Sequence, residues 1–150
     1  MQNKKAGRHK SENPRTFDLP KTRLTREERR MIELKAVMHS KGNMAEYIRD
    51  LVLKDTRIPK PLSTCLCGST SLKIIYKDEE REVNVGDQDL TLTLTGVPRS
   101  ECSTCGRIIG DMRLAAKLET VLDEEILWRV NNHHIIPKQI EFNELITITQ

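Results

Sequence analysis

The sequence predicts an α+β protein with a helical N-terminal part and a small β domain that is followed by a long helix. Three observations support this prediction. Two capped amphipathic segments lie between residues 21 and 55. Alternating hydrophobic residues between positions 72 and 95 indicate β-strands, and pairs of cysteines lie on both sides of them. Apolar residues then recur at helical spacing from 111 to 131.

The N-terminal part is expected to contain a short basic strand and two helices. Two capping pairs and one helix break mark the ends of these helices: Thr25 with Glu28, Asn43 with Glu46, and Lys41 with Gly42 between them. A unit of about 35 residues cannot bury enough apolar surface to fold alone, so a second copy of the chain is expected as its partner. The helical spacing assigns these residues to a dimer core: Met31, Ile32, Leu34, Val37, Met38, Tyr47, Ile48, Leu51 and Val52.

Residues 23–28 (RLTREE) and 43–49 (NMAEYIR) make this part resemble ribbon-helix-helix DNA-binding domains of the Arc, CopG and MobC type. The resemblance covers residues 17–55. It implies that two chains pair their N-terminal strands and interlock four helices, and that the paired strands enter the major groove of double-stranded DNA.

The residues expected to contact DNA are of two kinds. Strand alternation places Lys21 and Arg23 on one face, where Arg23 can bind a guanine edge; alternatively, both side chains only solvate an edge strand. Pro20 departs from the family's longer strand, because proline donates no ladder hydrogen bond. At the start of the second helix, a DNA phosphate is expected near Lys41 and the amides of Asn43, Met44 and Ala45, where Asn43 also serves as a cap.

Charge is distributed unevenly along the chain. Residues 1–60 hold 16 Lys and Arg against 8 Asp and Glu, whereas residues 61–150 hold 9 against 14. The basic first part suits a nucleic-acid partner. Residues 1–16 are polar and basic, so they are expected to be a disordered arm that follows the DNA. This arm lacks the apolar run of a signal peptide and no segment resembles a membrane span, so a cytoplasmic protein is expected.

All four cysteines of the chain form two close pairs, Cys65 with Cys67 and Cys102 with Cys105. Two such pairs on either side of a strand-rich stretch predict a structural zinc site with four thiolate ligands and one Zn²⁺ per chain. Two residues and a following glycine shape the second pair as a zinc knuckle. The first pair has one intervening residue, which is less usual. A disulfide framework and free thiols are the alternatives.

The β domain is expected at 63–131. Strands are predicted at 72–76, 83–85 and 90–95, with a turn at 86–89. The run LTLTLTGVP at 90–98, which leads into the second cysteine pair, is similar to the YgiT-type zinc fingers of MqsA-type antitoxins. That resemblance implies a zinc domain that binds a toxin, although the family usually has two residues between its first two cysteines.

The predicted helix at 111–131 carries an apolar stripe that either covers the sheet or pairs with another chain. A proline-containing linker is expected at 56–62, and residues 132–150 are a C-terminal tail with a possible final strand. His133 and His134 could bind a metal, but four thiolates already complete one site.

These predictions together describe a dimeric, sequence-specific DNA-binding transcriptional regulator that represses by occlusion, with a zinc domain for a partner or for assembly. The alternatives are an antitoxin-like protein whose zinc domain binds a toxin, and an accessory DNA-binding protein of the relaxosome. An enzyme is not expected, because the sequence contains no phosphate loop or Ser-His-Asp order, and four thiolates leave zinc no open position for water.

Overall fold

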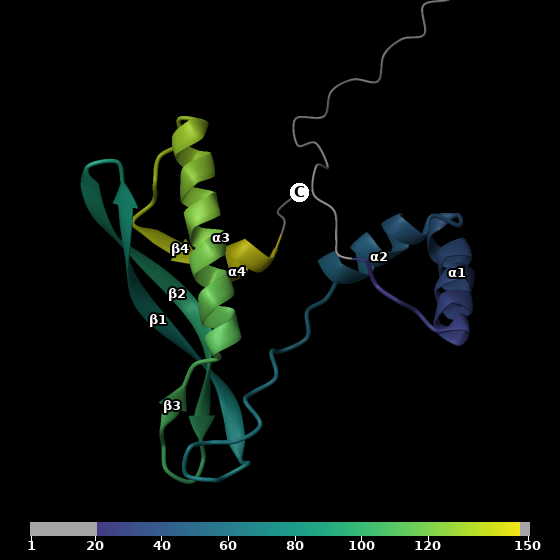
Figure 1. Ribbon diagram of the computed structural model, residues 1–150, viewed down its shortest axis with the longest axis horizontal. Helices are drawn as coiled ribbons and strands as arrows, with labels where there is room; N and C mark the ends of the chain where they lie inside the picture. The colour runs from purple at the N-terminus through teal and green to yellow at the C-terminus, as the bar shows by residue number, and fades with distance from the viewer. Residues whose placement is uncertain (1–20, 148–150) are drawn as a thin grey trace, which may run out of the picture. The chain divides into compact units, whose positions relative to one another are not determined.

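The computed structural model describes residues 21–147, which belong to two compact units divided after Asp50 (Figure 1). The arm predicted at 1–16 and residues 17–20 lie outside this range. Within it, helices and antiparallel strands together give the mixed α+β class that the sequence predicts. No helix in the described range is long and apolar enough to cross a membrane.

The N-terminal helices are α1 (Arg26–Ser40) and α2 (Met44–Leu53). Helix α2 runs three residues past the division after Asp50, and both whole helices are counted with the first unit. The predicted capping box is present at the start of α1, where Glu28 N–H donates to Thr25 Oγ1 (3.2 Å) and Thr25 N–H donates to Glu28 Oε2 (2.7 Å). Helix α1 ends where Lys41 and Gly42 adopt positive φ angles of 50° and 85°. Such angles suit glycine and turn the chain sharply. The break predicted at this position is therefore confirmed.

Residues 21–25 form no strand in the single chain. A two-stranded ribbon of the predicted kind needs hydrogen bonds from a second chain, so one chain alone has no partner for this segment. The ribbon remains a prediction.

The second unit is built on a long β-hairpin. Strands β1 (Leu72–Val85) and β2 (Gln88–Cys102) pair antiparallel along their whole length, with Leu72 opposite Cys102 and Val85 opposite Gln88. The short strand β3 (Ile108–Ile109) pairs antiparallel with β2 near its end, and β4 (Gln139–Glu141) pairs parallel with the middle of β2. Strand β2 is therefore central, and β1 forms one outer edge of the sheet.

The separate strands predicted at 72–76 and 83–85 are one continuous strand, so that division was wrong. The charged residues between them continue the strand, with a bulge between Lys77 and Glu79. At this bulge Gly96 N–H donates to Asp78 Oδ1 (3.0 Å), and Gly96 has a φ of 70°. A carboxylate that accepts the displaced amide, opposite a glycine, allows the ladder to continue past the irregularity.

Helix α3 (Met112–Asn131) starts at Asp111, whose Oδ1 accepts from the amides of Arg113 (2.8 Å) and Leu114 (3.4 Å). Figure 1 shows α3 lying across the hairpin. Three residues of the predicted stripe are buried there: Leu118, Leu122 and Ile126. They pack in one hydrophobic core with Val83, Leu92, Leu94, Val97, Ile140 and Phe142. The stripe therefore covers the sheet, which was one of its two predicted roles.

The C-terminal segment is part of this core. Ile140 on β4 is 1% exposed, and Phe142 begins the short helix α4 (Phe142–Ile146) and is 8% exposed. The final strand suggested within the tail at 132–150 is the short β4 (Gln139–Glu141) in the described part of the tail, and the helix α4 follows it. At the other end of the unit, Leu62 N–H donates to the buried Ser100 Oγ (2.9 Å), which attaches the end of the proline-containing segment to β2.

Candidate metal centre and nucleic-acid interface

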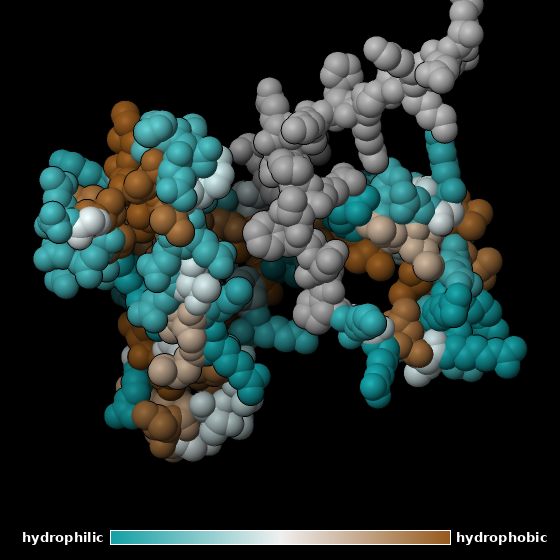
Figure 2. Space-filling view, turned by 45° about the horizontal axis from the view of Figure 1, so that its top comes forward, coloured by the Kyte–Doolittle hydropathy of each residue, from teal (hydrophilic) through white to brown (hydrophobic). Residues whose placement is uncertain are grey.

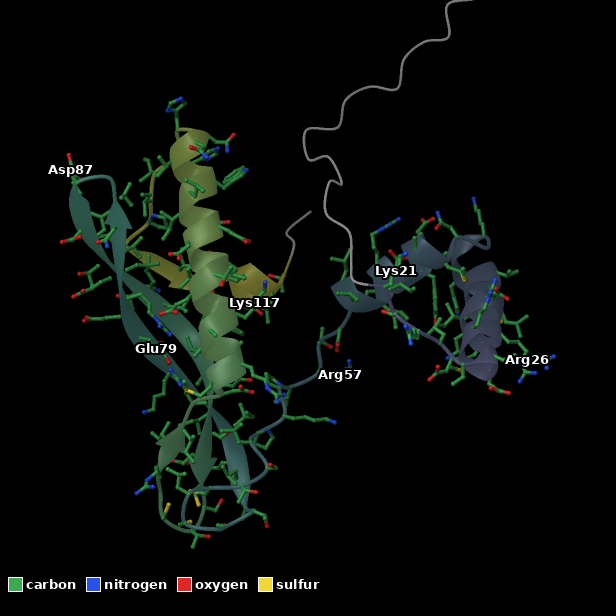
Figure 3. All side chains as sticks on the ribbon, viewed as in Figure 1. Lys21, Arg26, Arg57, Glu79, Asp87 and Lys117 are labelled. Atoms are coloured by element: carbon green, nitrogen blue, oxygen red, sulfur yellow. The ribbon has the colours of Figure 1, made fainter. Side chains whose placement is uncertain are left out.

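The four cysteines meet at the end of the second unit where β1 begins and β2 ends, and Figure 3 shows sulfur atoms gathered there. Their four Sγ atoms all lie within 4.8 Å of one another. The shortest contacts join the two pairs, with 3.6 Å between Cys65 and Cys105 and 3.7 Å between Cys67 and Cys102. A tetrahedral ion with metal–sulfur bonds near 2.3 Å requires sulfur separations of about 3.8 Å. The arrangement can hold one metal ion.

Each cysteine pair supplies one buried and one exposed thiol. Cys65 and Cys102 are 3% and 1% exposed, whereas Cys67 and Cys105 face solvent. The glycine after each pair, Gly68 (φ 88°) and Gly106 (φ 70°), adopts a left-handed conformation. These two glycines donate hydrogen bonds of 2.9 Å to the carbonyls of Cys65 and Cys102 respectively. Both pairs therefore form tight turns, including the first pair with its single intervening residue.

Backbone amides also point at the sulfurs, as the sequence predicts for the second pair. The amide of Cys105 is the largest influence on Cys102 and lowers its pKa, the Thr104 amide acts in the same direction, and together they outweigh burial to give about 6. The amide of Cys67 lowers the pKa of Cys65, but burial and hydrogen bonds with the other thiols raise it to about 11. The backbone amides thus favour the thiolate form at Cys102, which is the form that binds a metal ion.

Hydrogen bonds join the two turns that carry the cysteines. Thr104 Oγ1 donates to Ser69 Oγ (2.8 Å), and Ser103 N–H donates to the carbonyl of Ser71 (2.9 Å). Further along the hairpin, the ion pair of Lys73 with Glu101 (2.8 Å) joins the two strands. These contacts hold the two cysteine turns against each other and so orient the ligands of the site.

An ionic cluster in the hairpin was not foreseen from the sequence. Glu79 accepts hydrogen bonds from Arg99 and from Arg81 (2.8 Å), and all three side chains are mostly buried, with 15–25% of their surface exposed. The Arg99 guanidinium lies against Gly110, where a Cβ would come within 1.5 Å of Nη1. The run of charges at 78–80 suggested only an exposed segment between two strands, and no local pattern marks Arg99 as the partner of Glu79.

The first unit has an exposed apolar face. Within the described range up to Asp50, only Ala36, Ser40 and Tyr47 are buried, and His39 stacks on Tyr47 with ring centroids 5.9 Å apart. The larger apolar side chains of the two helices are 40–69% exposed: Met31, Leu34, Val37, Met38, Met44, Ile48, Leu51 and Val52. Figure 2 shows hydrophobic side chains at the surface of these helices. In the single chain, Tyr47 is the one residue of the predicted dimer core that is buried within the described range.

The predicted DNA-contacting residues are exposed and lie at two places. Lys21 and Arg23 belong to the extended segment before α1, and Figure 3 labels Lys21 there. The other four, Lys41, Asn43, Met44 and Ala45, gather at the turn between α1 and α2.

One detail of the predicted phosphate site is wrong. Asn43 N–H donates to the carbonyl of Ser40 (2.9 Å), so this amide is not available to a phosphate. Asn43 acts as the cap instead, because its Oδ1 accepts from the amide of Glu46 (3.1 Å). The amides of Met44 and Ala45 remain the candidates.

Comparisons of the chain with protein-family models, with curated proteins and with solved structures find no match.

Proposed function

We propose that this protein is a homodimeric, sequence-specific regulator of transcription that binds double-stranded DNA through its first unit. The observation that carries the proposal is the exposed apolar face of α1 and α2. Eight large apolar side chains at 40–69% exposure are far more than a stable surface of this size carries. They lie on helices with well-formed caps, so the segment is folded but lacks a partner for this face.

A second copy of the same chain is the partner that fits best. The spacing of Met31, Leu34 and Met38 on α1 repeats every three to four residues, which is the pattern of a helix that packs against another helix. In a twofold arrangement the extended segments 21–25 of both chains can pair as a ribbon, which would satisfy their backbone groups. The two basic units would then add their charges on one surface.

In this dimer the DNA contacts separate into two classes. Arg23 and Lys21 on the ribbon would reach base edges, while Lys41 and the amides of Met44 and Ala45 would hold the phosphate backbone. Binding across a promoter would repress transcription by occlusion. The four thiolates would hold a structural Zn²⁺ in the second unit, which would serve a protein partner or further assembly.

The test compares Arg23→Ala with Lys41→Ala on DNA from the protein's own promoter region and on scrambled DNA, by fluorescence anisotropy at physiological salt. The wild type should prefer its own site by about 1,000-fold or more. Arg23→Ala should reduce that preference by about 10- to 100-fold, because it removes a base contact. Lys41→Ala should weaken binding to both DNAs by the same factor. It should also reduce the slope of log binding constant against log salt concentration by about one, because one phosphate contact is lost.

Lys77→Ala is the matched control, since Lys77 is an exposed lysine of β1 in the second unit and should leave binding unchanged. Equal weak binding of the wild type to both DNAs would refute the regulator. A preferred site at an origin of DNA transfer, with no promoter bound, would assign the same DNA-binding unit to DNA processing.

A further inference from the structure

A groove at the hairpin end of the second unit has an apolar floor and an acidic rim. It lies between the β1–β2 turn and the C-terminal half of α3 and has a volume of about 520 Å³. The residues that line it are Glu82, Val83, Asn84, Val85, Gly86, Asp123, Ile126, Leu127 and Val130. Figure 1 shows these two elements ending side by side at the top of the view.

The floor of the groove joins buried core residues to exposed apolar residues at the surface. Val83 and Ile126 are 9% and 4% exposed, whereas Leu127 and Val130 beside them are 59% and 40% exposed. Exposure of such an apolar strip to water is unfavourable. Covering it with a complementary apolar face would be favourable by roughly 25 cal/mol per Å² of apolar surface removed from water. Its length along α3, from Asp123 to Val130, is two helical turns, a length suited to a helix laid across it.

The charged side chains that line the groove have one sign. Glu82 and Asp123 line it and are both exposed, and no Lys or Arg is among the lining residues. Asp87 lies in the adjoining turn, where Figure 3 labels it. Two copies of this chain placed groove to groove would bring these carboxylates together, so self-association here is electrostatically unfavourable. The occupant that fits carries basic residues beside an apolar face.

We propose that this groove binds a basic amphipathic helix of a partner protein, with apolar side chains on the Leu127–Val130 strip and Lys or Arg beside Glu82 and Asp123. This proposal extends the partner-binding role proposed above for the second unit. Because its test uses no DNA, failure of one proposal is distinguishable from failure of the other.

The probe is an 18-residue designed helical peptide with leucine on one face and lysine on the other. The control peptide has glutamate in place of every lysine. Binding to the full-length, metal-loaded protein is measured by isothermal titration calorimetry, and amide chemical shifts of the labelled protein locate the contact. The lysine peptide should bind at micromolar concentration, weaken with added salt, and shift the amides of Val85, Leu127 and Val130.

Two pairs of variants separate the groove from general adhesion. Glu82→Lys combined with Asp123→Lys should weaken binding at least tenfold, whereas Glu124→Lys, an exposed change of the same sign on α3 outside the lining, should not. Leu127→Ser should weaken binding, whereas Ile135→Ser, at a residue that is 88% exposed, should not. All five positions are exposed at the surface, so the fold should be retained, and circular dichroism checks this.

The proposal would be overturned if the glutamate peptide bound as tightly as the lysine peptide, or if the lysine peptide bound the variant with Glu82→Lys and Asp123→Lys as tightly as the wild type. It would also be overturned if the lysine peptide did not bind at millimolar concentration. A change of oligomeric mass in Leu127→Ser without peptide would also overturn it, because the groove would then be an interface between copies of this chain.

Discussion

Gly110 is the residue whose lack of a side chain has the clearest structural purpose. The Arg99 guanidinium occupies the space that a Cβ would need, and this position allows Arg99 to reach Glu79 while Arg81 binds the same carboxylate. Gly110 also precedes Asp111, the cap of α3, so one small residue joins the cluster to the start of that helix. The backbone there does not require glycine, which means that the close approach alone explains the choice.

Gly110→Ala should therefore lower the free energy of unfolding by roughly 1–3 kcal/mol, because Arg99 must leave a charged hydrogen-bond partner that is largely shielded from water. Chemical denaturation of the metal-loaded protein measures this loss. In a protein that already carries Arg99→Ala, Gly110→Ala should hardly lower the free energy of unfolding, since no guanidinium remains to be displaced. An equal cost in both backgrounds would show that Gly110 is needed for another reason.

The helices illustrate what local sequence determines. The caps at Thr25, Asn43 and Asp111 and the break at Lys41-Gly42 depend on residues three or four positions apart, and residues 25–53 and 111–131 follow the predicted pattern. The cysteine cluster was also predictable, because its residue types and spacing are specific. The continuity of β1 was not, because Glu79 is stabilised there by Arg99, a residue far away in the sequence. The parallel pairing of β4 with β2 depends likewise on a distant segment.

The exposed face of α1 gives a prediction at the level of the element. Val37→Asp places a charge on a side chain that is 65% exposed in the single chain. If α1 packs against a second copy, the aspartate would be buried in the dimer without a partner. The dissociation constant of the dimer should then rise at least 100-fold, as measured by sedimentation equilibrium. Ile135→Asp, at an 88% exposed residue of the second unit, is the matched control and should leave the mass unchanged. A monomeric wild type, or a dimeric Val37→Asp variant, would contradict the dimer.

For the whole molecule, the division into two units predicts that metal removal acts locally. The metal site holds the segments around 62–72 and 100–110, while the core of α3 and the hairpin lies further along the unit. A chelator should therefore increase hydrogen exchange first at the two cysteine turns, and mass spectrometry of exchanged peptides measures this. Exchange in α1 and α2 should not change, nor should the oligomeric mass. Loss of the dimer on chelation would show that the units depend on each other.

The position of β4 in the sheet has a consequence for synthesis of the chain. Residues 93–95 of the central strand pair with residues 139–141, and Phe142 completes the core beside them. The hairpin and α3 both precede β4 in the sequence, so a second unit without residues 139–142 leaves Leu94 and its neighbours open to water. A stop codon or a frameshift directly after Lys138 should therefore yield a chain that is degraded or aggregates, although both cysteine pairs and the whole of α3 are still encoded.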